Sequence, residues 1–507
     1  MHPAVFFMSW LTVIFSGINF SASGQKPTQV EIENADTFEG DESLGKNVSR
    51  LLGNVRFRHQ GALMYCDSAY LYQETNSLDA FGKIRIVQGD SINLTGDQLK
   101  YDGNTRQAKL TGKVVMTDRD MVLESKILNY NMNSETAEYF DGGKITDKQN
   151  VLTSKTGYYF SRDKTVFFRD SVVLTNPKYF IHADTLKYQT VTKVANFEGP
   201  TYIYSTGSDS TEIYCERGWY NTLTEKSVFT VRPYILSKEN RLAGDSLVYD
   251  NKSTVGFAYR NVTITDTVQK LIISGEYGYT DDKRKIALVT DRAVLTKAFD
   301  TDSLFLHADT LYAWQDTVTG ERAWSAYYGV RIFKSDLQGK CDSLVYKTSD
   351  STLNFYTEPV MWSEANQLTA TYINMQMANS KISELRLFNS AFIASSEDSL
   401  RFNQIKGRDM IGYFTDNQLT SIHVEGNGQS IYYTRNSKKQ FTGVNRADCS
   451  NMLITMIDSQ INSFTLINKP DATLFPINEL SPQELKLKGF SWLNDIRPVN
   501  KDDIFRQ

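Results

Sequence analysis

The chain has few of the residues on which most enzyme and metal sites are built. Its 507 residues include only 5 His, 4 Cys and 10 Pro. The sequence contains no H-E-x-x-H, P-loop, G-x-G-x-x-G or C-x-x-C motif, so the common zinc, nucleotide and dithiol sites have no basis here. A net charge of only −4 argues against an electrostatic nucleic-acid binder. We therefore expect no cofactor and no nucleic-acid partner.

Long apolar runs are also missing, except at the N-terminus. An apolar run from Val5 to Phe20 is followed by small residues of the kind found before a signal cleavage site. We expect residues 1–24 to be a cleaved secretory signal peptide and residues 25–48 to be a lead segment. An uncleaved anchor is the alternative, although the run is short for a membrane span. The expected product is an exported protein.

The chain does contain one pattern that is repeated many times. Copies recur about every 30 residues, a period typical of repeat proteins. The clearest copies are LTGDQLKYD (94–102), IHADTLKYQ (181–189), LAGDSLVYD (242–250), LHADTLYAW (306–314) and GKCDSLVYK (339–347).

The residues of each copy alternate in character with a period of two. Asp97, Leu99 and Tyr101 share one face, while Gln98 and Lys100 share the other. Such alternation, in segments rich in Val, Ile, Thr and Tyr between turn residues, is typical of half-buried β-strands. We expect an all-β, solenoid-like stack in which each unit supplies about two strands and pairs with its neighbours.

The regularity of the repeat divides the chain. It is clear over residues 49–350 and looser over residues 351–478, which are either a continuation of the same array or a second β-repeat module. In residues 479–507, Ser481 and Glu484 stand in the positions of a helix capping box. We expect a C-terminal tail with a short helix.

The four cysteines are not expected to pair. Cys66, Cys215 and Cys341 hold the same place in repeats that are several units apart. At about 4.8 Å per strand, their sulfurs would be roughly 20 Å or more apart, whereas a disulfide needs Cα atoms within about 7 Å. Cys449 lies further along the array. We predict four free, largely buried thiols and no disulfide.

The tetrapeptide Gly244-Asp245-Ser246-Leu247 matches the signature of the GDSL lipases and esterases. A nucleophilic serine needs a histidine base and an orienting acid, and no histidine of the chain follows an Asp by three residues. Other repeats replace the serine by Gln or Thr without disturbing the pattern. We therefore expect no enzyme activity, with Ser246 pointing away from the apolar face.

The acidic position of the repeat raises the question of a metal. A ladder of Asp residues binds Ca²⁺ in some β-solenoids, but those repeats supply several Asp and Gly per turn and this chain supplies one acid. We expect the acids to order turns through backbone hydrogen bonds instead. The residues are Asp67, Asp97, Asp184, Asp245, Asp309 and Asp342.

The remaining candidate for function is the apolar face of the strands. Two such faces either close into a dry core, which the pattern alone favours, or open along one edge into an apolar trough. The candidate lining residues expected on one arm are Leu99, Tyr101, Leu186, Tyr188, Leu247, Tyr249, Leu344 and Tyr346, and those expected on the other arm are Leu110, Phe168, Phe197 and Phe257.

These repeats resemble the OstA-like family of periplasmic lipopolysaccharide-transport proteins. The shared features are the unit YDGNTRQAKLTGKV (101–114), the opening GNVRF (53–57), the D-x-L-x-Y strands and the ending LKGFSWLNDIRP (487–498). Their phased repetition covers about residues 50–430.

The resemblance implies an elongated, twisted and partly open β-jellyroll of two facing antiparallel sheets. It implies that acyl chains of lipopolysaccharide, or of a related glycolipid, lie between the sheets against the Leu and Tyr residues named above. It also implies a periplasmic protein whose sheet edges pair with inner- and outer-membrane transport components, or with further copies end to end. The alternative is a secreted structural or interaction β-solenoid with a filled core and no lipid ligand.

Overall fold

The protein is an all-β molecule, as the alternation predicts. In the computed structural model the described chain is almost entirely antiparallel β-structure, and none of it forms a helix long and apolar enough to cross a membrane. The chain divides into two compact units, Met1–Asp141 and Gly142–Gln507. The expected signal peptide lies outside the described residues. These are residues 28–40, 47–206, 211–237, 240–266, 270–299, 302–379, 381–416, 418–457 and 460–506.

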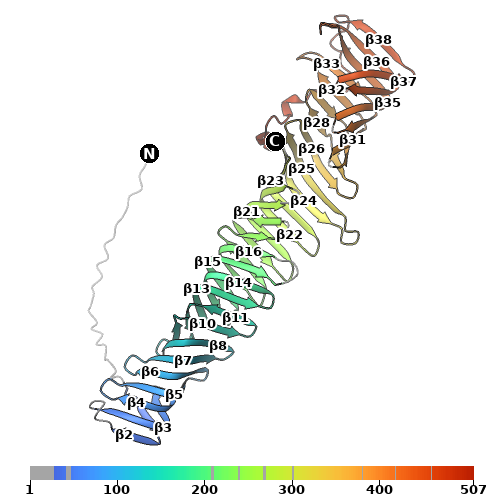
Figure 1. Cartoon of the computed structure of the whole chain (residues 1–507). Coiled ribbons are helices and arrows are strands. Elements are labelled where there is room, and N and C mark those ends of the chain that lie inside the picture. Colours follow the sequence, from blue (N-terminus) through green and yellow to red (C-terminus); the bar gives the residue numbers. More distant parts are fainter. Residues whose placement is uncertain are drawn as a thin grey trace, which may run out of the picture. The chain divides into compact units, whose positions relative to one another are not determined.

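Within each unit, most strands pair with their neighbours in the chain (Figure 1). The strands of the first unit are β1 (Glu31–Asn34), β2 (Thr37–Gly40), β3 (Val48–His59), β4 (Ala62–Tyr72), β5 (Ser77–Gln88), β6 (Ile92–Asp102), β7 (Gln107–Asp118), β8 (Met121–Asn131) and β9 (Thr136–Tyr139).

The second unit contains the remaining strands and two short 3-10 helices. Its elements are β10 (Gly143–Asp147), β11 (Asn150–Ser154), β12 (Thr156–Phe160), β13 (Thr165–Asn176), β14 (Tyr179–Gln189), β15 (Val194–Ser205), β16 (Glu212–Asn221), β17 (Lys226–Thr230), β18 (Tyr234–Leu236), β19 (Asn240–Ala243), β20 (Ser246–Asp250), β21 (Val255–Asp266), β22 (Leu271–Asp281), β23 (Ile286–Ala298), β24 (Ser303–Gln315), β25 (Arg322–Lys334), β26 (Leu337–Lys347), β27 (Thr352–Tyr356), β28 (Val360–Ser363), β29 (Asn366–Thr369), β30 (Tyr372–Ala378), β31 (Lys381–Phe388), β32 (Phe392–Ser396), β33 (Phe402–Lys406), β34 (Asp409–Thr415), β35 (Gln418–Arg435), β36 (Phe441–Ile457), β37 (Gln460–Ile467), β38 (Asp471–Pro476), η2 (Asn494–Ile496) and η3 (Lys501–Phe505).

Each long strand has a bulge near its middle, and its two halves belong to two facing arms. In β6 the register against β7 shifts between Thr95 and Gln98. We call the halves that carry the D-x-L-x-Y residues arm A, such as residues 98–102, and the other halves arm B, such as residues 92–95. Inward side chains of both arms are buried between them. The fold is therefore the two-sided β-jellyroll that the family resemblance implies.

The corner between the arms explains the Asp and Gly of each repeat. Gly112 has a φ of +105°, and any side chain there would overlap the carboxylate of Asp97. That carboxylate accepts a hydrogen bond from the backbone N–H of Lys113 at 3.2 Å. At Gly82, one rung earlier, an added side chain would likewise overlap the carboxylate of Asp67. In the rung of Asp97 the acid orders the turn, and in both rungs glycine leaves room for the carboxylate.

All four cysteines are free and buried, as the repeat spacing predicts. Burial raises the pKa of the thiols of Cys66, Cys215 and Cys341 to about 12. Because the thiolate is the nucleophile, these thiols behave as small apolar core residues.

Strand pairing passes without a break through residue 350. Arm A continues from β26 to β27 and β30, and arm B continues from β26 to β28 and β29. In this region each bent strand is replaced by two short strands, one in each arm. The loops that join the two short strands vary in length. This variation accounts for the looser sequence period after residue 350.

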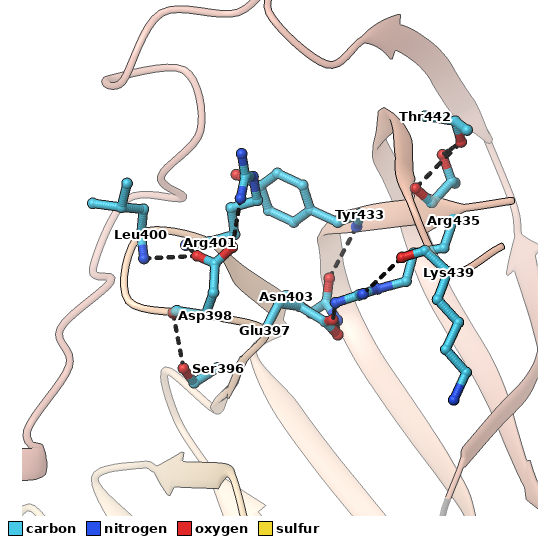
Figure 2. A network of polar contacts seen from close by, with 11 residues as sticks. Ser396, Glu397, Asp398, Leu400, Arg401, Asn403, Tyr433, Arg435, Lys439 and Thr442 are labelled. Atoms are coloured by element: carbon cyan, nitrogen blue, oxygen red, sulfur yellow. Dashed lines mark hydrogen bonds and ion pairs between the residues drawn. The ribbon is translucent and has the colours of Figure 1, made fainter.

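The late rungs of arm B are held by a polar network that the repeat does not predict (Figure 2). Asn403, in β33, donates its side-chain N–H to Glu397 at 2.6 Å and accepts the backbone N–H of Tyr433, in β35, at 2.9 Å. Glu397 also pairs with Arg435. The network therefore fastens the β32–β33 hairpin to β35.

The tail contains short helices, η2 and η3, but they lie further along the chain than the helix expected after Ser481. Ser481 and Glu484 do form the capping box, with the Ser481 N–H donating to Glu484 Oε2 at 2.9 Å. Only one turn follows, closed by the Leu485 N–H and the Ser481 carbonyl at 3.1 Å. The N–H of Leu487 donates instead to the side chain of Gln404 at 2.9 Å. The tail adopts an extended conformation after this turn, because the side chain of Gln404 in the sheet forms hydrogen bonds with its backbone.

Candidate functional site

The Leu and Phe candidates of the second unit, except Phe257, lie in one continuous ladder on the inward face of arm A, so the assignment of Phe168 and Phe197 to the opposite arm is wrong. Each member pairs in register with the next, and the predicted Leu and Phe residues among them are at most 2 % exposed. The ladder runs through Phe168, Leu186, Phe197, Gly218, Phe229, Leu247, Ala258, Gly278, Val289, Leu311, Ala326 and Leu344. In the first unit, Leu99 pairs directly with Leu110 in the corresponding ladder.

The four candidate tyrosines occupy the next inward position of arm A, but their surroundings differ. Tyr101 and Tyr188 are fully buried, whereas Tyr249 and Tyr346 are half-buried. The Tyr249 hydroxyl donates at 2.9 Å to the carboxylate of Asp282, which directly follows β22. Burial and this carboxylate raise the pKa of Tyr249.

The expected position of Phe257 on the same face is wrong. Phe257 pairs with Val248 and therefore lies on the outer face of arm A, where its ring packs against Tyr279 with centroids 5.4 Å apart. The inward residues of this strand are Gly256 and Ala258. The corner of β21 has no glycine that marks its position in the sequence. The inward residue was therefore predicted one position too early, at Phe257 instead of Ala258.

The interior of the first unit is closed by a hydrogen-bonded latch. His59, which is 1 % exposed, lies between Tyr101 and Thr28. Its Nε2 donates to the Thr28 carbonyl at 2.8 Å, so Nδ1 of the neutral ring accepts from the Tyr101 hydroxyl at 2.6 Å. Burial raises the pKa of Tyr101 to about 12. Tyr101 thus joins arm A to arm B at the end of β3.

The first rungs of the second unit are closed in a similar way. The Tyr188 hydroxyl of arm A donates to Asp147 at 2.9 Å and accepts from Asn150 at 3.2 Å. Asp147 and Asn150 flank the hairpin between β10 and β11 of arm B. Lys193 neutralises the buried Asp147 at 2.5 Å. This cluster is a polar clasp across the mouth of the interior.

Further along the second unit the interior becomes partly open. An unbroken aliphatic ladder follows the inward face of arm B, with each residue paired to the next. It runs through Ile145, Leu152, Leu174, Ile181, Ile203, Ile213, Ile235, Leu242, Ile264, Ile273, Leu295, Leu306 and Ile332. The two ends of the ladder are buried, but five consecutive members are only half-buried. We call these five, Ile213, Ile235, Leu242, Ile264 and Ile273, the open segment.

The last two members of the open segment, Ile264 and Ile273, lie in strands whose arm A halves carry small inward side chains. At the inward positions of β21 and β22 in arm A, where the earlier repeats carry Leu and Tyr, the residues are Gly256, Ala258, Gly278 and Thr280. Such side chains are too short to cover the aliphatic residues of arm B. An aliphatic surface half-open to solvent can accept an apolar ligand.

The serine of the GDSL tetrapeptide lies away from this surface. Ser246 is on the outer face of arm A between Thr230 and Tyr259, and among the described residues no histidine bonds to it. Asp245 sits at the corner, where its carboxylate accepts a hydrogen bond from Asn261 at 3.1 Å. Elsewhere in the described ranges, no group of three or more His, Cys, Asp or Glu is placed to hold a metal ion.

Sequence reasoning missed the contacts of the C-terminal tail. Gln404 accepts from the Leu487 N–H and donates to the Leu485 carbonyl at 2.8 Å. Nearer the end of the tail, the side chain of Gln367 accepts a hydrogen bond from the Leu493 N–H at 2.7 Å. These glutamines lie on arm B, and Leu487 and Leu493 belong to the LKGFSWLNDIRP segment, which Leu485 precedes by two residues. A detectable signal was that segment's large apolar residues, which follow the last strand.

Comparison with known proteins identifies part of the chain. Residues 27–184 match the family model described as OstA-like protein. Among solved structures, one match is LptH from Pseudomonas aeruginosa, described as the LptA-homologous periplasmic component of the conserved lipopolysaccharide transport device. It is 18 % identical, with 22 % of this chain and 82 % of that chain covered and a TM-score of 0.21. No curated protein gives a significant match. The resemblance inferred from the repeats is confirmed over residues 27–184.

Proposed function

From the OstA-like region at residues 27–184, we propose that this chain is a non-catalytic periplasmic carrier of lipopolysaccharide. In this proposal acyl chains bind between the two arms and move along them from the inner toward the outer membrane. The observation that carries the proposal is the unbroken aliphatic ladder of arm B, with its five half-buried members.

The proposed path suits the physical chemistry of an acyl chain. Exposing each CH₂ group to water costs about 0.8 kcal/mol, so a lipid with several chains needs an apolar escort. Successive rungs about 4.8 Å apart offer nearly equal contacts, which lets a chain advance without a deep energy minimum. We propose that lipid first enters at the open segment, because entry near Tyr101 or Tyr188 would require their hydrogen bonds across the interior to break.

One edge strand in each unit suits partners that add a further strand. In the described residues, β2 pairs only with β3, and β38 pairs only with β36. Both carry exposed apolar residues, since Phe38 is 58 % and Leu474 is 61 % exposed. Exposed strand edges of this kind bind further strands by β-augmentation. We propose these edges as the contacts with membrane components or with further copies of the chain.

The proposal can be tested by site-specific photo-cross-linking. A benzoylphenylalanine in place of Ile264 is expected to capture lipopolysaccharide in the envelope, because this side chain belongs to the open segment. The matched control is Thr263, its neighbour on the opposite face of the same strand. Equal or absent capture at the two positions, together with no glycolipid in the mass spectrum of the purified protein, would contradict the proposal.

A structural β-solenoid without a lipid ligand is the second candidate. The closed interior of the first unit favours it, because Leu99, Tyr101 and Leu110 are all buried there. Under this alternative the protein would purify free of lipid, and the Ile264 cross-linker would remain unreacted.

A further inference from the structure

The outer face of arm A is hollowed over β14–β17. The hollow has a volume of about 720 Å³, which is within the range typical of small-ligand sites. The side chains that matter for its chemistry are Lys187, Asn196, Glu198, Arg217, Trp219 and Thr230.

These residues form two neighbouring rows on one face of the sheet. In the first row, Asn196 pairs with Lys187 on one side and with Trp219 on the other. In the second row, Arg217 pairs with Glu198 and Thr230. Since side chains alternate along a strand, both rows face away from the inward ladder, although Phe197 and Gly218 of that ladder also line the hollow. The polar side chains of the hollow therefore lie on the opposite face of arm A from the proposed lipid path.

The charges in the hollow favour an anion. Lys187 and Arg217 are exposed and form no ion pair in the described part of the chain, and Glu198 is the single acid beside them. A free guanidinium binds a phosphate through two parallel hydrogen bonds.

The remaining groups favour a sugar. The half-buried indole of Trp219 offers a flat apolar surface on which the C–H face of a pyranose can pack. Asn196, Thr230 and Glu198 supply donors and acceptors for hydroxyl groups around that surface. An aromatic face, hydroxyl partners and two free cations occur together in this hollow.

We propose that this hollow binds a phosphorylated saccharide, with the sugar ring against Trp219 and the phosphate between Lys187 and Arg217. The side chains proposed to bind the saccharide lie on the outer face of arm A and not between the arms, so the proposal does not depend on the proposed lipid path. The saccharide is either free or the headgroup of a glycolipid.

The first unit offers a matched control. A hollow of about 340 Å³ lies over the same face of arm A and also contains two lysines, Lys100 and Lys109. It has no aromatic group apart from the inward Tyr101, and Lys100 lies 3.6 Å from Asp79. We expect this hollow to bind no saccharide.

The test is titration of the full mature chain with glucose 1-phosphate, followed by calorimetry and ligand-observed NMR. Arg217→Gln and Trp219→Leu are each expected to weaken binding about tenfold, the loss of one charge-assisted or aromatic contact. Lys100→Gln is expected to change nothing. The side chain of Arg217 is exposed and forms no ion pair in the described part of the chain, so this variant keeps the proposal testable even where Trp219→Leu impairs folding.

Three outcomes would overturn the proposal: no binding, equal binding of inorganic phosphate alone, or equal binding by the Arg217→Gln variant. Competition with dispersed lipopolysaccharide then separates the two sources. Displacement of glucose 1-phosphate identifies a lipid-linked sugar, and its persistence identifies a free one. Cross-linking at Ile264 is expected to be unchanged in Arg217→Gln, so failure of either site is distinguishable from failure of the other.

Discussion

The tyrosine of the D-x-L-x-Y pattern shows how one residue type serves different ends in different rungs. Tyr101 meets the imidazole of His59, and Tyr188 meets the carboxylate of Asp147. Both partners come from the opposite arm, about 40 residues away in the sequence. The Tyr249 hydroxyl donates to Asp282, which follows the arm A half of β22, and Tyr249 stays half-buried. The partner across the interior therefore decides whether a rung is closed.

Closure of the first unit is expected to weaken below about pH 6.5. Burial lowers the pKa of His59 below its usual 6.5, an effect larger than the opposing hydrogen bond to Thr28. The unfolded chain then binds the proton more readily, so the stabilisation is complete above pH 6.5 and is lost as the pH falls through the folded-state value.

The measurement is hydrogen exchange at the Val30 N–H, which donates to Asn76 beside the latch at 2.9 Å. Its protection factor is expected to be lower at pH 5 than at pH 7. A His59→Gln variant is expected to remove this pH dependence. Equal protection of the original protein at both pH values would contradict the prediction.

The recurring element is the bent strand with a left-handed corner. Gly112 adopts this conformation without cost, but Arg260 and Asn261 adopt it with φ values of +55° and +50°. Asp291 and Arg292 do so two strands later. A left-handed residue with a side chain costs roughly 1 kcal/mol or more, so the neighbouring strand pairs must stabilise the corner.

The corner glycine is expected to be sensitive to substitution. In Gly112→Ala the added methyl group would overlap the Asp97 carboxylate. The substitution is expected to lower the free energy of unfolding by about 1–3 kcal/mol. Gly61→Ala is the control, because Gly61 is also left-handed at +83° but has no atom within 4 Å of the added group. Denaturant unfolding with hydrogen exchange in β6 and β7 checks the difference. Equal losses for the two variants would contradict it.

At the scale of the whole molecule, the C-terminal tail fastens the late rungs of the second unit. Leu487 belongs to a small apolar core with residues of β32, β35 and β36, and Phe490 packs against it. Arg497 donates to Gln338, 159 residues earlier in the chain. Contacts over such separations hold arm B in place without adding a strand to it.

Removal of one glutamine is expected to loosen this tail. Gln404→Ala deletes both hydrogen bonds to the backbone of Leu485 and Leu487 and is expected to weaken tail docking by about 1–3 kcal/mol. Limited proteolysis between residues 479 and 493 measures the effect as faster cleavage. Gln418→Ala, at an exposed position of β35, serves as the control. Cleavage at the original rate in Gln404→Ala would mean that the apolar contacts alone hold the tail.

Much of the fold was predictable because its signals are local. Alternation with a period of two identified the strands, and the repeat period placed Cys66, Cys215 and Cys341 too far apart to bond. The prediction of the inward residue was wrong at Phe257, because Arg260 and Asn261 replace the glycine that marks other corners. It succeeded at Phe197, two residues before Gly199.

By itself, the sequence determined the strands, the apolar faces, the free thiols and the turn role of Asp97, because each depends on spacing along the chain. The tertiary structure alone decided which faces are closed. Exposure of Ile264 depends on the size of side chains on the opposite arm, and closure at Tyr101 depends on His59. The path of the tail was likewise decided in three dimensions, because its backbone bonds to glutamines that are remote in sequence.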